Sequence, residues 1–168
     1  AFLENNGDKI KSDFELINTE DFAAISHLKN PQEILAIAQF YVRETKPTDW
    51  QIALDGIKDP GNLGTIIRIA DWYGISTIYC SSDTVELYNS KVIQSTMGSF
   101  LRVSVIVGKL EVLIADKPVF ATLLSGENIR TLPKSNNGVL LIGNEANGIQ
   151  PELLEKLSHT AITIPDKG

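Results

Sequence analysis

The sequence predicts an α/β fold in which a parallel β-sheet is covered by helices on both faces. From residue 50 onward, short runs of apolar residues alternate with amphipathic segments of helical period. Runs without polar alternation are typical of parallel strands, because helices cover both faces of such sheets. Gly74 and Gly98 follow two of the amphipathic segments, where a glycine is suited to end a helix. We therefore expect one doubly covered sheet over most of the 168 residues.

Each element follows in order from these patterns. The apolar runs predict strands at residues 52–54, 75–80, 103–107, 119–124, 139–142 and 161–164. The amphipathic segments predict helices at residues 63–73, 89–97, 110–115 and 152–157, the last of them opened by Pro151.

The amino-terminal stretch is predicted to be a separate unit. Residues 14–17 are strand-like, residues 19–25 read as a short helix capped by Thr19, and residues 34–42 form a second apolar strand. The polar segment 43–49 carries a proline and is typical of a linker. We therefore assign residues 1–46 to the end of one domain and residues 47–168 to the next.

Composition and charge narrow the class of protein. With 43% hydrophobic residues the chain can bury a core, and its one cysteine, Cys80, offers no disulfide partner. No apolar run is long enough to cross a bilayer, and no signal sequence is visible, so we expect a cytoplasmic protein. The net charge of −6 argues against sequence-independent nucleic-acid binding, which depends on many basic residues. No metal is expected, because His27 and His159 have no companions at ligand spacing.

Two motifs far apart in the chain predict one site. Asn62, Gly64 and Arg68 follow the first strand of the main domain, and the run Gly143-Asn144-Glu145-Ala146-Asn147-Gly148 follows a later one. Loops after the carboxyl ends of parallel strands meet in one crevice, so these residues can share a pocket. A dinucleotide-binding enzyme is disfavoured, because neither a Gly-x-Gly-x-x-Gly loop nor a Walker motif occurs.

The residue types in these motifs allow several roles. Asn62 precedes the predicted helix and can act as its N-cap. Arg68 is a cation among apolar helix residues, which favours a functional contact over a solvated one. Glu145 lies either in a simple polar turn, marked by Asn147-Gly148, or beside Arg68 as a partner that orients its guanidinium. Gly143 leaves room for a ligand to approach the backbone.

The motifs resemble those of the SpoU family of RNA ribose 2'-O-methyltransferases, in the SPOUT class. The first family motif is present as Asp59-Pro60-Gly61-Asn62-Leu63-Gly64-Thr65-Ile66-Ile67-Arg68, and the second as Leu141-Ile142-Gly143-Asn144-Glu145-Ala146-Asn147-Gly148-Ile149. The third begins with Ile164-Pro165 and is cut short at Gly168. The resemblance implies a carboxyl-terminal trefoil knot that lacks its last helix here, and residues 13–45 are similar to the tail of an L30e-like RNA-binding domain. An ordinary helix and strand at a domain edge remain an alternative for that stretch.

The resemblance also implies an activity and its residues. It implies transfer of a methyl group from S-adenosylmethionine to a ribose of ribosomal or transfer RNA, with Asn62, Arg68 and Glu145 as catalytic residues. We expect Arg68 to hold a phosphate and stabilise the developing alkoxide, because a guanidinium does not readily give up a proton. Glu145 either orients Arg68 or accepts the proton itself. The cofactor candidates are Thr122, Leu123, Gly126, Gly143, Asn144, Gly148, Ile164 and Pro165.

Partners follow from the same resemblance. RNA contacts are expected at Lys58, Arg68, Lys91 and Arg102, although Lys91 and Arg102 are also consistent with solvated surface charges. A homodimer with shared active sites is implied, and the mixed apolar and small residues of 92–101 suit either an interface or the core. The start without Met and the stop at Gly168 suggest a fragment, and we expect a version ending there to bind cofactor poorly. The alternative function is a non-catalytic RNA-binding or dimerisation module with the same fold.

Overall fold

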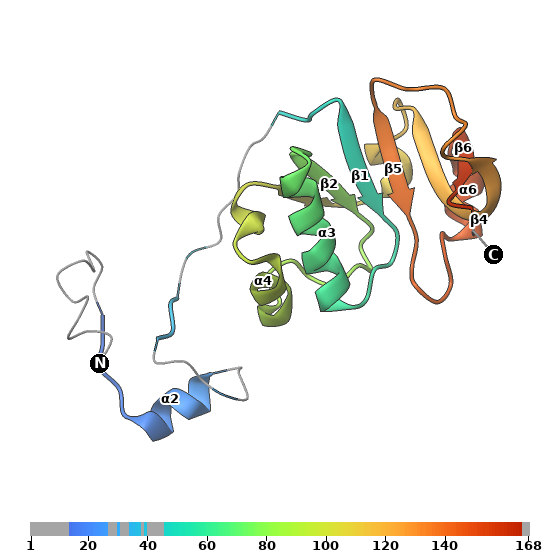
Figure 1. Cartoon of the computed structure of the whole chain (residues 1–168). Coiled ribbons are helices and arrows are strands. Elements are labelled where there is room, and N and C mark those ends of the chain that lie inside the picture. The colour runs from blue at the N-terminus through green and yellow to red at the C-terminus, as the bar shows by residue number, and fades with distance from the viewer. Residues whose placement is uncertain (1–13, 27–29, 31–33, 38, 40–45, 166–168) are drawn as a thin grey trace. The chain divides into compact units, whose positions relative to one another are not determined.

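The computed structural model describes residues 14–26, 30, 34–37, 39 and 46–165. The chain divides into two compact units, Ala1–Phe40 and Tyr41–Gly168. Within the described residues of the first unit, helix α2 spans Thr19–Ile25 as predicted (Figure 1). Its cap is Asn18 and not Thr19, because the Asn18 side chain accepts the N–H of Asp21 at 2.8 Å.

The two strands predicted in the first unit are not borne out where the structure describes them. Residues 14–17 and 34–37 form no strand, and part of the predicted strand 34–42 lies outside the described residues. Leu16 and Ile37 are 75% and 92% exposed. Within the described residues of the first unit, these two apolar side chains are therefore not packed in a core. The likeness to an L30e-like domain stays a prediction.

The second unit contains a six-stranded sheet in the order β3-β2-β1-β5-β4-β6, in which all neighbours are parallel (Figure 1). The strands are β1 Trp50–Leu54, β2 Thr77–Cys80, β3 Ser104–Val107, β4 Val119–Asn128, β5 Gly138–Ile142 and β6 His159–Thr163. Each corresponds to a predicted apolar run, and the predicted parallel α/β class is confirmed.

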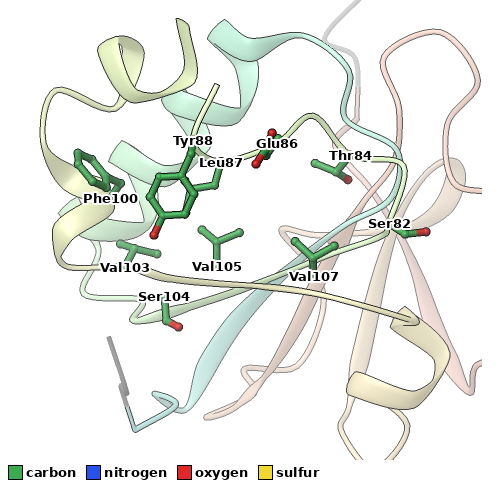
Figure 2. Close-up of a pocket in the computed structure, with 10 residues that line it drawn as sticks. All are labelled: Ser82, Thr84, Glu86, Leu87, Tyr88, Phe100, Val103, Ser104, Val105 and Val107. Atoms are coloured by element: carbon green, nitrogen blue, oxygen red, sulfur yellow. The ribbon is translucent and has the colours of Figure 1, made fainter. Parts of the chain in front are cut away.

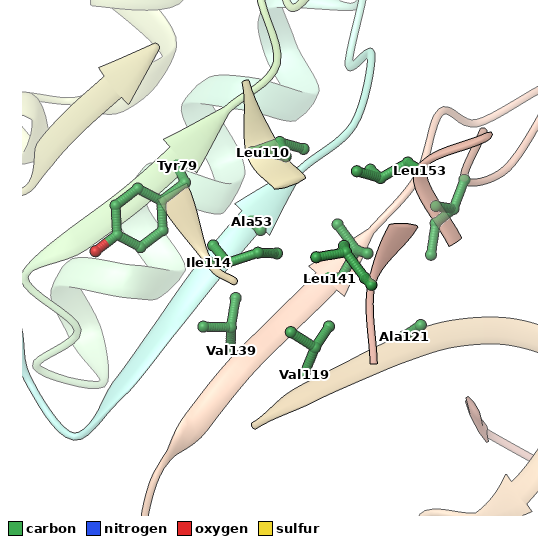
Figure 3. Close-up of a cluster of buried hydrophobic side chains, with 11 residues drawn as sticks. Ala53, Tyr79, Leu110, Ile114, Val119, Ala121, Val139, Leu141 and Leu153 are labelled. Carbon is green, nitrogen blue, oxygen red and sulfur yellow. The ribbon is translucent and has the colours of Figure 1, made fainter. Parts of the chain in front are cut away.

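Helices cover the two faces of the sheet in separate groups. They are α3 Pro60–Trp72, α4 Ser90–Thr96, α5 Leu110–Leu113 and α6 Pro151–Lys156, with a short 3-10 helix, η2, at Ser99–Leu101. On one face, Ile52 and Leu54 of β1 pack against α3 and α4. On the other face, Ala53 joins the cluster formed with α5 and α6, shown in Figure 3. This alternation explains why the strands read as apolar on both sides.

Helix α3 begins three residues earlier than predicted. Asp59 is its N-cap, since its Oδ1 accepts the N–H of Asn62 at 2.8 Å, and Pro60 occupies the first turn. Asn62 is therefore not the cap, and its side chain is available for another contact. Gly64 is required by packing, because a Cβ there would lie 1.9 Å from Ser95 Oγ of α4.

Strand β4 is longer than predicted because it pairs with β6 on both sides of a bulge. The register shifts between Thr122 and Glu127, after which Glu127 and Asn128 pair with Ile162 and Thr163. A Cβ on Gly126 would lie 2.7 Å from the backbone of Ala161, so the two strands approach closely at this glycine. In the part of the chain that the structure describes, no helix has the length and apolarity to span a bilayer.

Candidate functional site

The strand order has a switch point between β1 and β5. From β1 the chain passes through α3 to β2 on one side, whereas from β5 it passes through α6 to β6 on the other. Such a switch point leaves a crevice beyond the carboxyl ends of the two strands, where ligands bind in open α/β sheets. Both predicted motifs follow these two strands, so the topology brings them together.

The two motifs are joined by a direct hydrogen bond. Asn62 Nδ2, in the first turn of α3, donates to Glu145 Oε1 at 2.7 Å, across 83 positions of sequence. Asn144 Nδ2 lies 3.3 Å from the other carboxylate oxygen of Glu145. Amide donors therefore face both oxygens of the carboxylate, and its orientation is fixed although the residue is exposed.

The loop that carries Glu145 is closed on itself. Asn144 and Gly148 exchange two backbone hydrogen bonds of 2.9 Å, and Asn144 Oδ1 accepts the N–H groups of Ala146 and Asn147. A Cβ on Gly143 would lie 2.2 Å from the backbone of Gly148. The glycine at 143 is thus explained by the tightness of the loop, and the room that we expected there for a ligand is filled by the protein.

Arg68 does not pair with Glu145 within one chain. It lies six residues beyond Asn62, which is about 9 Å along the helix axis and on a different side of the helix. The exposed face of α3 carries it together with Thr65, Ile69 and Trp72. Among the described residues no ion pair to Arg68 occurs. The pairing inferred from the sequence is therefore absent from the single subunit.

Two of the other predicted RNA contacts are already engaged. Lys58 Nζ lies 3.1 Å from Asp83 Oδ2, and Arg102 makes a bidentate pair with Asp71, with Nη2 to Oδ2 at 2.6 Å. The Arg102 guanidinium holds the pKa of Asp71 below its usual range, first through hydrogen bonding. Lys91 is exposed near the start of α4. The ion pair with Asp71 supports the interpretation of Arg102 as an ordinary surface charge.

The cofactor candidates fall into three neighbouring segments. Thr122 Oγ1, in β4, donates to the carbonyl of Leu141 in β5 at 3.0 Å, and Leu123 packs partly against the core. Gly143, Asn144 and Gly148 belong to the closed loop, and Ile164 and Pro165 follow β6. Around the β4 bulge, the side chains of Leu124 and Ile164 are 104% and 75% exposed.

A buried carboxylate that the sequence did not single out also belongs to this region. Asp55 follows β1 directly, is 3% exposed, and accepts the N–H of Gln150 with Oδ2 at 2.7 Å. The next residue, Gly56, has a φ of 69° and donates its N–H to Ser81 Oγ at 2.8 Å. The sequence signal that could have identified Asp55 is an acidic residue directly after a buried strand.

A second hollow lies apart from the motifs. It is an apolar groove at the β3 edge, lined in part by Leu87, Tyr88, Phe100 and Val105 (Figure 2). None of the sequence-predicted catalytic or cofactor residues lines it. Over the described residues, no group of three or more His, Cys, Asp or Glu side chains is placed to hold a metal ion. Burial raises the pKa of the Cys80 thiol to about 12, which makes it a poor nucleophile.

The domain of this chain that carries both motifs is similar to domains of known proteins. Residues 49–168 match the model of the SpoU rRNA Methylase family. The chain is 29% identical over 160 residues to the 23S rRNA (guanosine(2553)-2'-O)-methyltransferase RlmP of Bacillus subtilis, covering 88% of this chain and 64% of that protein.

Solved structures agree with the sequence comparison. An rRNA methyltransferase from Sinorhizobium meliloti has a TM-score of 0.77 at 33% identity, over 90% of this chain and 62% of that one. Its AdoMet-bound form has a TM-score of 0.73 at 32% identity, over 90% and 62% of the two chains. The chain spans less than two thirds of the length of these relatives.

Proposed function

Because the chain belongs to the SpoU rRNA methylase family, as its motifs predicted, we propose that it methylates RNA on a ribose 2'-oxygen. The methyl donor in this proposal is S-adenosylmethionine, and the substrate is ribosomal or transfer RNA. The observation that carries the proposal is the 2.7 Å bond between Asn62 and Glu145, which assembles both motifs at the switch point of the sheet. A relative named as a 2'-O-methyltransferase of 23S rRNA makes 23S rRNA the first substrate to test.

The chain's own residues have distinct roles in the proposed reaction. S-adenosylmethionine, held by the segments around Thr122, Gly143 and Ile164, would supply an activated methyl group. Asn62 and Asn144 hold the Glu145 carboxylate toward solvent, where it can accept a hydrogen bond or the proton from a ribose 2'-hydroxyl. Arg68 binds an RNA phosphate and stabilises the negative charge that develops on the ribose oxygen.

We further propose a homodimer whose sites combine residues of two subunits. Its support is that Arg68 is exposed on α3 and, among the described residues, makes no ion pair with Glu145 of its own chain. Nearby side chains are unusually apolar for a surface, since Trp72 and Met97 are 85% and 75% exposed. Within the segment 92–101, Val92, Thr96 and Ser99 are buried, and the exposed residues that remain for an interface are Gln94, Met97 and Leu101. The carboxyl-terminal knot and a cytoplasmic location are part of the same proposal.

A methyl-transfer assay tests the function. The protein is incubated with unmodified 23S rRNA transcript or with total RNA and labelled S-adenosylmethionine, and the methylated ribose is mapped by resistance to alkaline cleavage. We expect Arg68→Ala and Glu145→Gln each to lower the rate by about a hundredfold or more, with the fold retained. Lys117→Ala, far from the motifs, is the matched control. RNA binding without methyl transfer by the unaltered protein would favour the non-catalytic module.

A further inference from the structure

The closed loop that carries Glu145 is held at both of its ends by two consecutive residues of the β1 end. At the near end, Asn144 Nδ2 donates to the Gly56 carbonyl at 2.8 Å. At the far end, the N–H of Gln150 donates to Asp55 Oδ2 at 2.7 Å. Asn144 and Gly148 close the loop with two backbone hydrogen bonds, so these two contacts anchor a compact segment.

The anchor at Asp55 is the buried one. Its side chain is 3% exposed and lies at the end of the central strand β1, which is paired on both sides. Gly56 is fixed in turn by Ser81, whose hydroxyl donates to Asp83 Oδ1 at 2.6 Å. The loop is therefore anchored to the middle of the sheet.

We propose that Asp55 is a positioning residue, whose carboxylate holds the far end of the 143–150 loop and so keeps Glu145 in reach of Asn62. The inference rests on the proposed function, because it assigns Asp55 a part in presenting Glu145 to the ribose. Asp55 itself does not touch the reacting atoms in this proposal. Loss of its anchor lowers the turnover rate and leaves substrate affinity largely unchanged, because it displaces a group that acts on the bound substrate.

Charged groups from each neighbouring element face the same hollow as Asp55. They are Asp83 after β2, Lys109 and Glu111 at the start of α5, and Glu152 and Lys156 of α6. Burial raises the pKa of Asp55 above its ordinary value, the Gln150 N–H opposes this rise, and the charge of Asp83 adds to it. A protonated carboxyl accepts a hydrogen bond less strongly than a carboxylate. The anchor therefore weakens as the pH falls, and turnover falls with it.

One substitution removes the donor and keeps the aspartate at residue 55, although the proline ring Cδ takes the place of the hydrogen and displaces the carboxylate. Gln150 has a φ of −60° and a ψ of 130°, which proline adopts, so Gln150→Pro deletes the N–H at a compatible backbone position. Gln150→Ala is the matched control, because it removes the side chain and keeps the N–H. We expect Gln150→Pro to lower kcat for methyl transfer about ten- to a hundredfold, with KM values for RNA and S-adenosylmethionine within about threefold of the unaltered protein. Gln150→Ala should remain near the unaltered rate.

A second variant and a measurement without catalysis complete the test. Asp55→Asn retains an acceptor oxygen but no titration, so it should remove the acid limb that Asp55 contributes to the kcat profile. The amide resonance of Gln150 should shift with pH in the unaltered protein and not in Asp55→Asn, whether or not methyl transfer occurs. Circular dichroism establishes that each variant is folded.

The outcomes separate the two proposals. Unaltered kcat in folded Gln150→Pro, or equal losses in Gln150→Pro and Gln150→Ala, would overturn the positioning role. So would a Gln150 amide whose pH titration is the same with and without the Asp55 carboxyl, and this result decides the matter if Gln150→Pro does not fold. Absence of methyl transfer by the unaltered protein counts against the proposed function, while the amide titration still reports on the anchor.

Discussion

At the scale of single residues, the candidate site is built from short polar side chains that fix one another. Asn62, Asn144 and Glu145 form one hydrogen-bonded group. Asp55 anchors the same loop by accepting the backbone N–H of Gln150. The sequence identified the first three through their motifs. It could not reveal the Asp55 contact, because Gln150 lies 95 positions away and contributes only its backbone N–H.

The buried carboxylate of Asp55 is expected to cost stability at neutral pH. Its folded-state pKa is raised above the unfolded value, so the fold favours the protonated form. The penalty is present when the carboxyl is ionised, and it disappears as the pH falls through the raised pKa toward about 3.9, the unfolded value. We therefore expect Asp55→Asn to unfold at a higher urea concentration than the unaltered protein at pH 7, with the difference shrinking by pH 4. Paired urea titrations across this range measure it, and a less stable variant at pH 7 would contradict the sign.

At the scale of secondary structure, the sequence predicted every strand of the sheet but misplaced several ends. Helix α3 begins at Pro60 because Asp59 caps it, whereas the sequence pattern predicts Asn62 as the cap. The segment Ser125-Gly126-Glu127-Asn128 is polar and resembles a turn, yet β6 pairs with its end across the bulge. At residues 14–17 the apolar pattern forms no strand. Local patterns thus located buried strands, while tertiary pairing decided where they end.

The contact between α3 and α4 yields a second prediction. A Cβ on Gly64 would lie 1.9 Å from Ser95 Oγ and 2.9 Å from the Ser95 backbone, so Gly64→Ala must push the two helices apart. Overpacking of this kind costs about 1–3 kcal/mol of unfolding free energy. Gly74→Asn is the control at the other end of the helix, because its φ of 71° suits asparagine and nothing lies within 4 Å. Equal unfolding midpoints for Gly64→Ala and the unaltered protein would show that the helix contact is loose.

At the scale of the whole molecule, the proposed second subunit would account for the separation of Arg68 from Glu145. The chain has 15 Lys and Arg residues against 21 Asp and Glu, and Lys58 and Arg102 are already paired with carboxylates. A partner that supplies Arg68 to Glu145 would concentrate positive charge where the ribose binds.

Mixing two inactive variants tests the shared site. If Arg68 and Glu145 of one site come from different subunits, a mixed dimer of Arg68→Ala and Glu145→Gln contains one intact site. Random exchange of subunits then restores about one quarter of the sites, from half of the dimers with one of two sites each. We expect methyl transfer to recover to about that level after exchange, and sedimentation equilibrium should give a dimer mass. No recovery despite proven subunit exchange would place both residues in one subunit's site.

The pairing of β1 with β5 has a consequence for how the protein comes into being. Residues 50–54 pair with residues 138–142. The middle of the sheet therefore forms only when two distant segments of the chain come together. Contacts of such high sequence separation form slowly, because the entropy of closing the loop must be lost first. During synthesis, β1, α3, β2 and β3 can emerge and pack while Glu145 is still unmade. The two motifs of the site therefore come together late in folding, after the fifth strand has been synthesised.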